Sequence, residues 1–323
     1  MKLLVAGGAG YIGSVVTRLL VQEGHEVVIL DDLSTGHADS VPEGVRLESA
    51  SIADADRILD GAGFDAVLHF AAKSLVGESV ERPSIYWHTN VVGTRLLLDA
   101  MARHGVPRLV FSSTAAVYGE PDQVPITEDT PCRPTNTYGA TKLAVDMMIS
   151  GECIATGLGA VSLRYFNVAG AALGAGERHA IETHLIPIAL DATSGLRDKL
   201  TIHGDDWPTP DGTPVRDYVH VLDLARAHVL ALGAAQPGEH LICNLGNGNG
   251  FSVREVMTAI EEVTGLPLPA TVGPRRAGDP TELVASSDRA RYRLGWVPEF
   301  DLRRMVADAW AFRGTAPATG DRR

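Results

Sequence analysis

The sequence predicts an α/β fold in which a doubly wound parallel sheet is followed by a smaller α/β substrate-binding domain at the C-terminal end. Short apolar runs alternate with helical patterns over the first half of the chain, a glycine-rich loop follows the first run, and the alternation loosens after about residue 168. Continuously apolar strands separated by helices are typical of parallel sheets covered on both faces.

The predicted elements follow one another in a regular order. We expect strands at residues 2–6, 26–30, 45–47, 65–70, 108–112 and 160–164, and helices at 11–23, at 86–104 and from 138 onwards. Gly24 is a typical stop signal for the first helix. Short helices are expected again at 222–232, 253–263 and 302–312.

The loss of alternation indicates two domains, at residues 1–168 and 169–323. Loops rich in proline, glycine and aspartate, such as 205–214, interrupt the second half of the chain. Alternatively, the segment at about 216–245 packs back on the first domain.

Composition narrows the classes of function. The 323 residues are 45% hydrophobic, enough for a large core, and the net charge of −12 lies in no long run of one sign. This favours a protein without nucleic-acid or membrane-surface binding. Cys132, Cys153 and Cys243 are scattered and lack metal-ligand spacing, so we expect reduced thiols and no metal. No apolar run approaches the length of a membrane span, and together with the reduced thiols this predicts a cytoplasmic location.

The glycine-rich loop predicts a dinucleotide site. Gly7, Gly10 and Gly13 stand between the first strand and the first helix, where residues without Cβ permit a tight turn and leave the helix N-terminus facing a pyrophosphate. This places the first domain in the Rossmann type. Asp31 ends the second strand, where a carboxylate accepts hydrogen bonds from ribose hydroxyls and repels a 2′-phosphate, so NAD is favoured over NADP.

Tyr138 and Lys142 are candidates for a catalytic pair. On a helix they lie one turn apart on the same face, where the ammonium can favour a phenolate over a phenol. An unperturbed tyrosine with a pKa near ~10 is a poor base at neutral pH, so such help matters. The spacing alone also arises by chance, and its place downstream of the glycine loop supports the catalytic interpretation.

Motifs in order along nearly the whole chain resemble a known family. The extended short-chain dehydrogenase/reductase superfamily has similar segments to Gly-Gly-Ala-Gly-Tyr-Ile-Gly at 7–13, His-Phe-Ala-Ala at 69–72, Val-Gly-Glu-Ser at 76–79, Asn-Val-Val-Gly-Thr at 90–94, Phe-Ser-Ser-Thr-Ala-Ala-Val-Tyr-Gly at 111–119, Tyr-Gly-Ala-Thr-Lys at 138–142 and Leu-Arg-Tyr-Phe-Asn at 163–167. Two further segments resemble the UDP-glucose 4-epimerase family within that superfamily. They are Asp-Gly-Thr-Pro-Val-Arg-Asp-Tyr-Val-His-Val at 211–221 and Pro-Arg-Arg-Ala-Gly-Asp at 274–279.

The resemblance implies roles for individual residues. Tyr138 would be the catalytic base and acid, Lys142 would hold the nicotinamide ribose and lower the phenol pKa, and Thr114 would place a hydroxyl beside the reacting C4 oxygen. The implied NAD contacts are Gly7, Gly10, Tyr11, Ile12, Gly13, Asp31, Asp32, Leu33, Ser34, Thr35, Ser51, Ile52, Phe70, Ala71, Ala72, Ser74, Asn90, Ser112, Tyr138, Lys142 and Tyr165. The implied contacts to a UDP-sugar are Ser113, Thr114, Tyr138, Asn167, His184, Leu185, Thr201, His203, Arg216, Arg276, Asp279 and Leu283.

Several of these residues have ordinary structural alternatives. Thr114 and Asn167 could be strand-end or turn residues, Arg216 and Arg276 could be solvated surface charges, and the histidines could be structural.

Other positions depart from the family pattern. Ser51 stands where many relatives have Asp, and Ser74 where some have Lys, which implies weaker or different cofactor contacts.

The resemblance implies inversion at C4 of a UDP-hexose through a transient 4-keto intermediate and bound NAD, in a homodimer paired through helices at 86–104 and 138–155. A 4-epimerase of UDP-N-acetylhexosamine or UDP-glucuronate is the main alternative, because Leu283 stands at a gate beside the C2 substituent: a bulky aromatic there would exclude N-acetylated sugars, and a small residue would admit them. A nucleotide-sugar 4,6-dehydratase would carry Asp-Glu where Ala115-Ala116 stand. An NADP-dependent reductase is disfavoured by Asp31, and an inactive dinucleotide sensor would tend to lose the Tyr-Lys pair.

Overall fold

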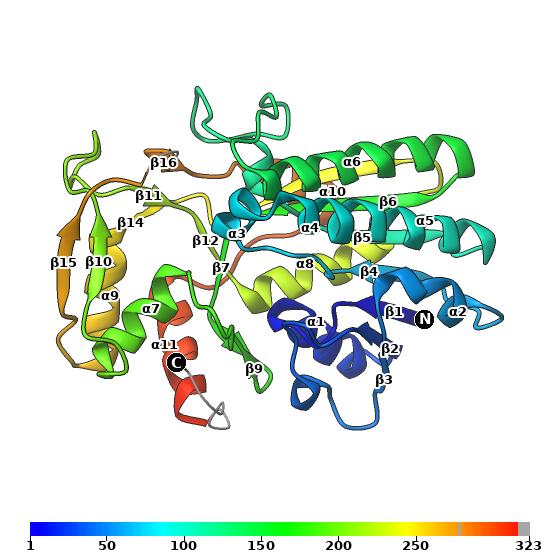
Figure 1. Cartoon of the computed structure of the whole chain (residues 1–323), viewed down its shortest axis with the longest axis horizontal. Helices are drawn as coiled ribbons and strands as arrows, with labels where there is room; N and C mark the ends of the chain where they lie inside the picture. The colour runs from blue at the N-terminus through cyan, green and yellow to red at the C-terminus, as the bar shows by residue number, and fades with distance from the viewer. Residues whose placement is uncertain (277–278, 316–323) are drawn as a thin grey trace.

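A seven-stranded parallel sheet forms the centre of the molecule. The computed structural model describes residues 1–276 and 279–315. In it the strand order is β13-β6-β5-β4-β1-β2-β3 (Figure 1). The strands are β1 (Lys2–Ala6), β2 (Glu26–Asp31), β3 (Arg46–Ser49), β4 (Ala66–His69), β5 (Arg108–Thr114), β6 (Gly159–Tyr165) and β13 (His240–Leu245). The predicted α/β class with a doubly wound parallel sheet is confirmed.

Helices cover both faces of this sheet, as continuously apolar strands require. Leu3 and Val5 of β1 belong to one buried cluster with α1 (Tyr11–Gln22) and α8 (Val221–Ala234). Leu4, which points to the opposite face, belongs to a second cluster with α2 (Ala55–Leu59), α5 (Gly93–Arg103) and α6 (Thr137–Thr156). The apolar side chains of β1 are therefore shielded from water on both faces of the sheet.

The helix predicted at residues 86–104 is interrupted. Its first turns are α4 (Pro83–Tyr86), a π-helical segment η3 (Trp87–Val92) follows, and α5 completes it. Wider π turns are rare and occur mostly at functional sites, because they redirect a side chain that a regular helix would place elsewhere. Here the segment carries Asn90, which is buried.

The stretch at residues 216–245 contributes to the central sheet. It includes β12 (Tyr218–His220), α8 and β13, and β13 pairs in parallel with β6 along its whole length. The chain thus leaves the sheet after β6 and returns to its edge. The domain boundary near residue 168 stays a prediction.

Most of the remaining elements gather around a separate core at the carboxyl ends of the parallel strands (Figure 1). Small sheets pair β10 (Leu200–His203) with β15 (Ala270–Gly273), β11 (Val215–Arg216) with β14 (Phe251–Ser252) and β16 (Glu282–Leu283), β7 (Asn167–Ala169) with β12, and β8 (Ala171–Ala172) with β9 (Ala175–Gly176). The helices of this part are α7 (Leu185–Thr193), α9 (Val253–Thr264) and α11 (Leu302–Thr315), whereas α10 (Asp288–Leu294) packs against α8 and β13 at the central sheet. The short helical segments elsewhere are η1 (Ala38–Ser40), η2 (Ile52–Asp54), α3 (Val76–Glu81) and η4 (Ala115–Val117). Within the described ranges, every helix is too short or too polar to cross a membrane.

Candidate active site

The glycine loop between β1 and α1 has two positions that exclude any side chain. Gly7 has a φ of +83°, and a Cβ there would lie 2.5 Å from the backbone nitrogen of Ala71. A Cβ on Gly13 would lie 2.1 Å from the carbonyl oxygen of Gly7. Gly10 is less constrained and forms the N-cap of α1, with no capping side-chain hydrogen bond. The loop therefore presents bare backbone and a helix N-terminus at the carboxyl end of β1.

Asp31 lies beside this loop. Its Oδ2 accepts a hydrogen bond from the Ala9 N–H at 2.9 Å, and its Oδ1 accepts one from the Leu33 N–H at 2.9 Å. Burial raises the pKa of Asp31 above its ordinary value, while both hydrogen bonds favour the carboxylate. The side chain thus fixes the glycine loop relative to the loop after β2, where Leu33 adopts a positive φ of 57°.

Asn90 positions the loop after β4. Its Oδ1 accepts a hydrogen bond from the Lys73 N–H at 2.8 Å, and its Nδ2 donates to the Lys73 carbonyl at 3.0 Å and to Thr141 Oγ1 at 3.0 Å. All of these bonds are internal to the protein. Asn90 therefore ties the segment that includes Phe70, Ala71, Ala72 and Ser74 to helix α6.

The N-terminus of α6 places the candidate base. Asn136 caps the helix by accepting a hydrogen bond from the Gly139 N–H at 2.9 Å. A Cβ on Gly139 would lie 2.4 Å from the Ala116 carbonyl oxygen, so glycine lets the helix pack directly on η4. That contact brings Tyr138, in the first turn, within hydrogen-bond reach of Thr114 at the end of β5.

Lys142, one turn further along α6, is almost fully buried beneath Tyr138. Its Nζ donates to the Ser112 carbonyl at 2.8 Å and lies 4.8 Å from the centre of the Phe111 ring and 6.0 Å from that of Tyr138. Ser112 Oγ in turn contacts the Tyr165 hydroxyl. Three of the predicted cofactor residues are thus joined through one strand end.

Burial dominates the proton affinities of this pair. It raises the pKa of Tyr138, and the hydrogen bond with Thr114 opposes that shift. Burial also lowers the pKa of Lys142 to about 7, against the stabilising charge of Asp146. The phenol pKa is therefore raised in this structure, where the sequence predicted a lowering by Lys142, because a low-dielectric site disfavours both charged forms.

Ser113 points to the opposite side of β5 from Ser112 and Thr114, as strand alternation requires. Its hydroxyl donates to Asp146 Oδ2 at 3.2 Å, and the buried Arg164 donates to the same oxygen at 2.9 and 3.0 Å. Its predicted role in substrate binding is not supported by this direction. Sequence reasoning missed the Asp146–Arg164 pair, which anchors α6 to β6.

The second part of the chain presents two groups of predicted substrate residues. Arg216 of β11 is directly paired with Leu283 of β16. Burial lowers the pKa of Arg216, and the negative charge of Asp279 opposes this. On β10, His203 Nε2 lies 2.8 Å from a guanidinium nitrogen of Arg276.

The other predicted residues occupy varied positions. Tyr11 donates its hydroxyl to the Gly170 carbonyl at 2.6 Å, and Asn167 donates to the Asp217 carbonyl at 3.0 Å. Ser51 caps η2, and Ile52 is buried in the core against α5. Exposed positions in the same predicted set are Asp32, Ser34, Thr35, Ser74 and Thr201, whereas Ile12 and Leu185 are half-buried.

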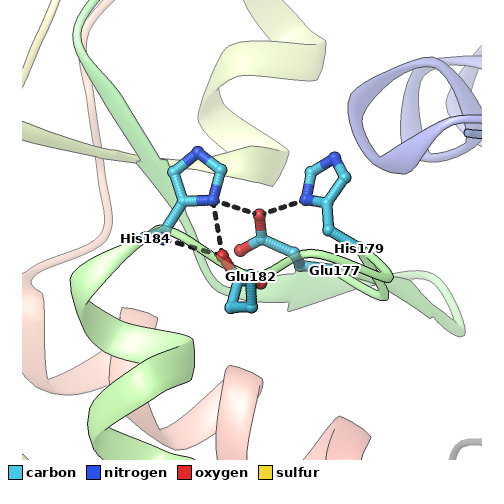
Figure 2. A group of neighbouring side chains, drawn as sticks. All are labelled: Glu177, His179, Glu182 and His184. Carbon is cyan, nitrogen blue, oxygen red and sulfur yellow. Dashed lines mark hydrogen bonds and ion pairs between the residues drawn. The ribbon is translucent and has the colours of Figure 1, made fainter. Parts of the chain in front are cut away.

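His184 contacts two carboxylates, and its role in substrate binding stays a prediction. Its Nδ1 lies 2.8 Å from Glu177 Oε1 and 2.8 Å from Glu182 Oε1, in a group that includes His179 (Figure 2). Burial opposes the charged imidazole, but the hydrogen bonds and charges of the two carboxylates outweigh it and raise the pKa of His184 to about 10. Glu177, His179 and Glu182 are not among the predicted site residues, although the spacing Glu-x-His-x-x-Glu-x-His is a readable signal in the sequence.

Comparisons with known proteins identify the family. Residues 3–246 match the model of the NAD dependent epimerase/dehydratase family. The chain belongs to this family. A UDP-glucose 4-epimerase of Corynebacterium glutamicum is 58% identical, and the alignment covers 100% of this chain and 98% of that protein.

Solved structures that are similar to this chain are also UDP-glucose 4-epimerases. The crystal structure of a UDP-glucose 4-epimerase matches with a TM-score of 0.96 at 47% identity, over 99% of this chain and 100% of the other. A UDP-glucose 4-epimerase from Stenotrophomonas maltophila, with bound NAD and formylated UDP-arabinopyranose, matches with a TM-score of 0.93 at 40% identity, over 98% of both chains. The resemblance drawn from the motifs and the prediction of NAD as cofactor are confirmed.

Proposed function

We propose that this protein interconverts UDP-glucose and UDP-galactose by inverting the configuration at C4 of the sugar. The observation that carries the proposal is the arrangement of Tyr138, Thr114 and Lys142 at one edge of the sheet. The same edge carries the glycine loop, and the arginines Arg216 and Arg276 lie on the neighbouring part of the chain. This is a dinucleotide site combined with a proton-transfer group and a region suited to a diphosphate.

The residues present fit NAD. A side chain at Gly7 or Gly13 would collide with neighbouring backbone, so glycine keeps the turn tight, and the α1 N-terminus lacks a capping side chain, as expected for residues that would hold a pyrophosphate. Asp31 would hold the adenosine ribose, and Lys142 would hold the nicotinamide ribose. When bound, NAD supplies an acceptor for the C4 hydride, returns that hydride, and adds a positive charge that favours the Tyr138 phenolate.

Tyr138 performs the proton transfer in this mechanism. Its phenolate removes the proton from the sugar 4-hydroxyl as C4 loses hydride, and Thr114 holds the same oxygen or relays the proton. The product of this half-reaction is a 4-keto sugar that is still attached to UDP. In the second half, the Tyr138 hydroxyl returns its proton to the C4 oxygen.

Inversion requires that the keto sugar turn over without leaving. Contacts from Arg216 and Arg276 to the diphosphate would retain the nucleotide, while the hexose rotates about its bonds to phosphorus and presents its other face. Hydride then returns with inverted configuration and no net redox change. Ordinary dehydrogenases release the ketone, so retention is the step that makes this chain an epimerase.

Leu283 favours a second activity on UDP-N-acetylhexosamines. The side chain is half-buried and pairs with Arg216 across two short strands, and it is smaller than the aromatic residue that would exclude an N-acetyl group. We propose that the C2 pocket tolerates this substituent in part.

We also propose a cytoplasmic homodimer. Leu96 on α5, together with Met147 and Ile154 on α6, is exposed to 42%, 69% and 85%. These helices lie next to each other on one face of the sheet. Light scattering after size exclusion would give twice the chain mass of 34.3 kDa for a dimer and that mass for a monomer.

The function is tested with purified protein supplied separately with UDP-galactose, UDP-N-acetylgalactosamine and UDP-glucuronate. We expect chromatography to show UDP-glucose formed from the first, a slower conversion of the second and none of the third. Conversion of none of the three would remove the proposal.

A further inference from the structure

A group of four metal-type side chains lies on the loop between β9 and α7. Glu177, His179, Glu182 and His184 each offer one ligand atom, and these atoms all lie within 4.8 Å of one another. Figure 2 shows the Glu177 carboxylate between the two imidazoles, with Glu182 beside His184. All four come from a span of eight consecutive positions, 177–184, so one local loop conformation builds the whole group.

The contacts within the group have the length of ordinary hydrogen bonds. Nδ1 of His179 lies 2.7 Å from Glu177 Oε1, and Nδ1 of His184 lies 2.8 Å from the same oxygen. Glu182 Oε1 lies 2.8 Å from His184 Nδ1 and also accepts from the backbone N–H groups of Thr183 and His184, at 2.8 and 2.7 Å. The backbone therefore fixes the Glu182 carboxylate in its inward orientation.

The donor set matches Zn²⁺. Two imidazole nitrogens and two carboxylate oxygens are typical zinc ligands, and Mg²⁺ and Ca²⁺ prefer oxygen ligands alone. Metal–ligand distances of about 2.0–2.2 Å place tetrahedral ligand atoms roughly 3.4 Å apart. To admit the ion, the present contacts of 2.7 and 2.8 Å would open by about 0.6 Å, and ligand atoms as far apart as 4.8 Å would close by about 1.4 Å. One dication also balances the two carboxylates while both imidazoles stay neutral.

Solvent can reach the group from one side. The side chains of Glu177 and Glu182 are only 9% and 13% exposed, whereas those of His179 and His184 are 28% and 45% exposed. The carboxylates thus form the base and the imidazoles form the rim.

The loop joins two parts of the molecule. Arg178, between two of the four residues, donates to Asp39 Oδ2 at 2.9 Å and to Ser40 Oγ at 2.9 Å, and its carbonyl lies 3.0 Å from His37 Nε2. These three partners lie just beyond the loop that follows Asp31. At its other end, His184 is the N-cap of α7.

We propose that Glu177, His179, Glu182 and His184 bind one Zn²⁺ ion per chain, and that this ion is structural. It fastens the loop between the segment following Asp31 and the start of α7, and it takes no part in hydride or proton transfer. The inference stands apart from the proposed epimerase reaction, because its test measures the metal.

The test uses the full chain without an affinity tag, stripped with a chelator and dialysed. Zn²⁺ is titrated in competition with a chromophoric chelator, against wild type, His179→Ala, Glu182→Gln and the control His88→Ala, which alters an exposed histidine outside the group. We expect one ion per wild-type chain, affinity at least tenfold lower in the two group variants, and no change in the control.

Co²⁺ provides a second measurement on the wild type itself, so the test survives a variant that fails to fold. Intense visible absorption of tetrahedral Co²⁺, abolished by one equivalent of Zn²⁺, is expected. Binding of less than one Zn²⁺ per chain, absence of the Co²⁺ spectrum, or equal affinity in wild type and a folded His179→Ala variant would overturn the proposal.

Discussion

The two sides of the candidate active site are built in different ways. On the dinucleotide side, Tyr138, Lys142 and Thr114 lie on a twenty-residue helix and a seven-residue strand, held by buried hydrogen bonds. On the nucleotide-sugar side, Arg216 and Leu283 lie on strands of two residues each, and His203 and Arg276 lie on a strand end and a loop.

This difference separates chemistry from binding. Proton and hydride transfer need atoms held to a fraction of an ångström, which long buried elements provide. A sugar that must turn over between two half-reactions is better served by contacts at its nucleotide end and by a less rigid region around the hexose. The comparison predicts that changes on the first side act on kcat, and changes on the second act mainly on KM.

The largest effect is expected from Tyr138→Phe. Loss of the phenolic oxygen removes the base and acid, and kcat should fall by roughly 10²- to 10⁴-fold. Bound NAD, measured by absorbance after release, should be retained. Tyr292→Phe, at a side chain that is 89% exposed, is the matched control. Retained turnover in Tyr138→Phe would show that the base lies elsewhere.

Arg216→Met tests the nucleotide-sugar side of the site. Loss of charge-assisted bonds to the diphosphate should lower kcat/KM by about 10- to 100-fold, mostly through a higher KM for UDP-galactose. Arg46→Met alters an exposed arginine of β3 and should leave both constants unchanged. A fall confined to kcat would contradict the separation of chemistry from binding.

Lys142 should make the free energy of unfolding depend on pH. Burial lowers its pKa to about 7 in the folded chain, whereas the unfolded chain keeps the ordinary value near ~10.4. Between these values the unfolded state binds more protons, so stability rises with pH. In urea titrations without NAD, wild type should gain up to about 1.4 kcal/mol per pH unit relative to Lys142→Met. Lys199→Met, at an exposed position, is the control, and parallel slopes for wild type and Lys142→Met would refute the assigned burial effect.

The smallest effect concerns specificity. Leu283→Tyr should reduce turnover of UDP-N-acetylgalactosamine by a factor of about 10 relative to UDP-galactose, because the ring would occupy space near the C2 substituent. Chromatography of both reactions with the same enzyme sample measures the ratio. Equal losses on the two sugars would mean that Leu283 does not line this pocket.

The dinucleotide side was predictable because local rules determine it. Gly7 and Gly13 are required by backbone contacts within one loop, and the Tyr138–Lys142 spacing needs only a helix. The pKa values were not predictable in the same way. The spacing of Tyr138 and Lys142 predicts that the ammonium lowers the pKa of Tyr138. Burial, which depends on the whole fold, raises that pKa instead.

The nucleotide-sugar side and the group around His184 depend on contacts that sequence patterns do not encode. Arg216 meets Leu283 only because two strands distant in sequence pair in register. His184 was assigned to the substrate by resemblance, whereas its neighbours Glu177 and Glu182 draw its imidazole to themselves. The prediction of no metal rests on the spacing of the cysteines alone. It leaves out the spacing of the glutamates and histidines at residues 177–184.

The most direct test of hydride transfer from C4 uses UDP-galactose labelled with deuterium at that carbon. Hydride that leaves C4 and returns within one active site carries the label with it, so the UDP-glucose formed should retain deuterium at C4 by mass and NMR analysis. Loss of the label to solvent would show that C4 loses a proton and not a hydride, and would contradict the mechanism.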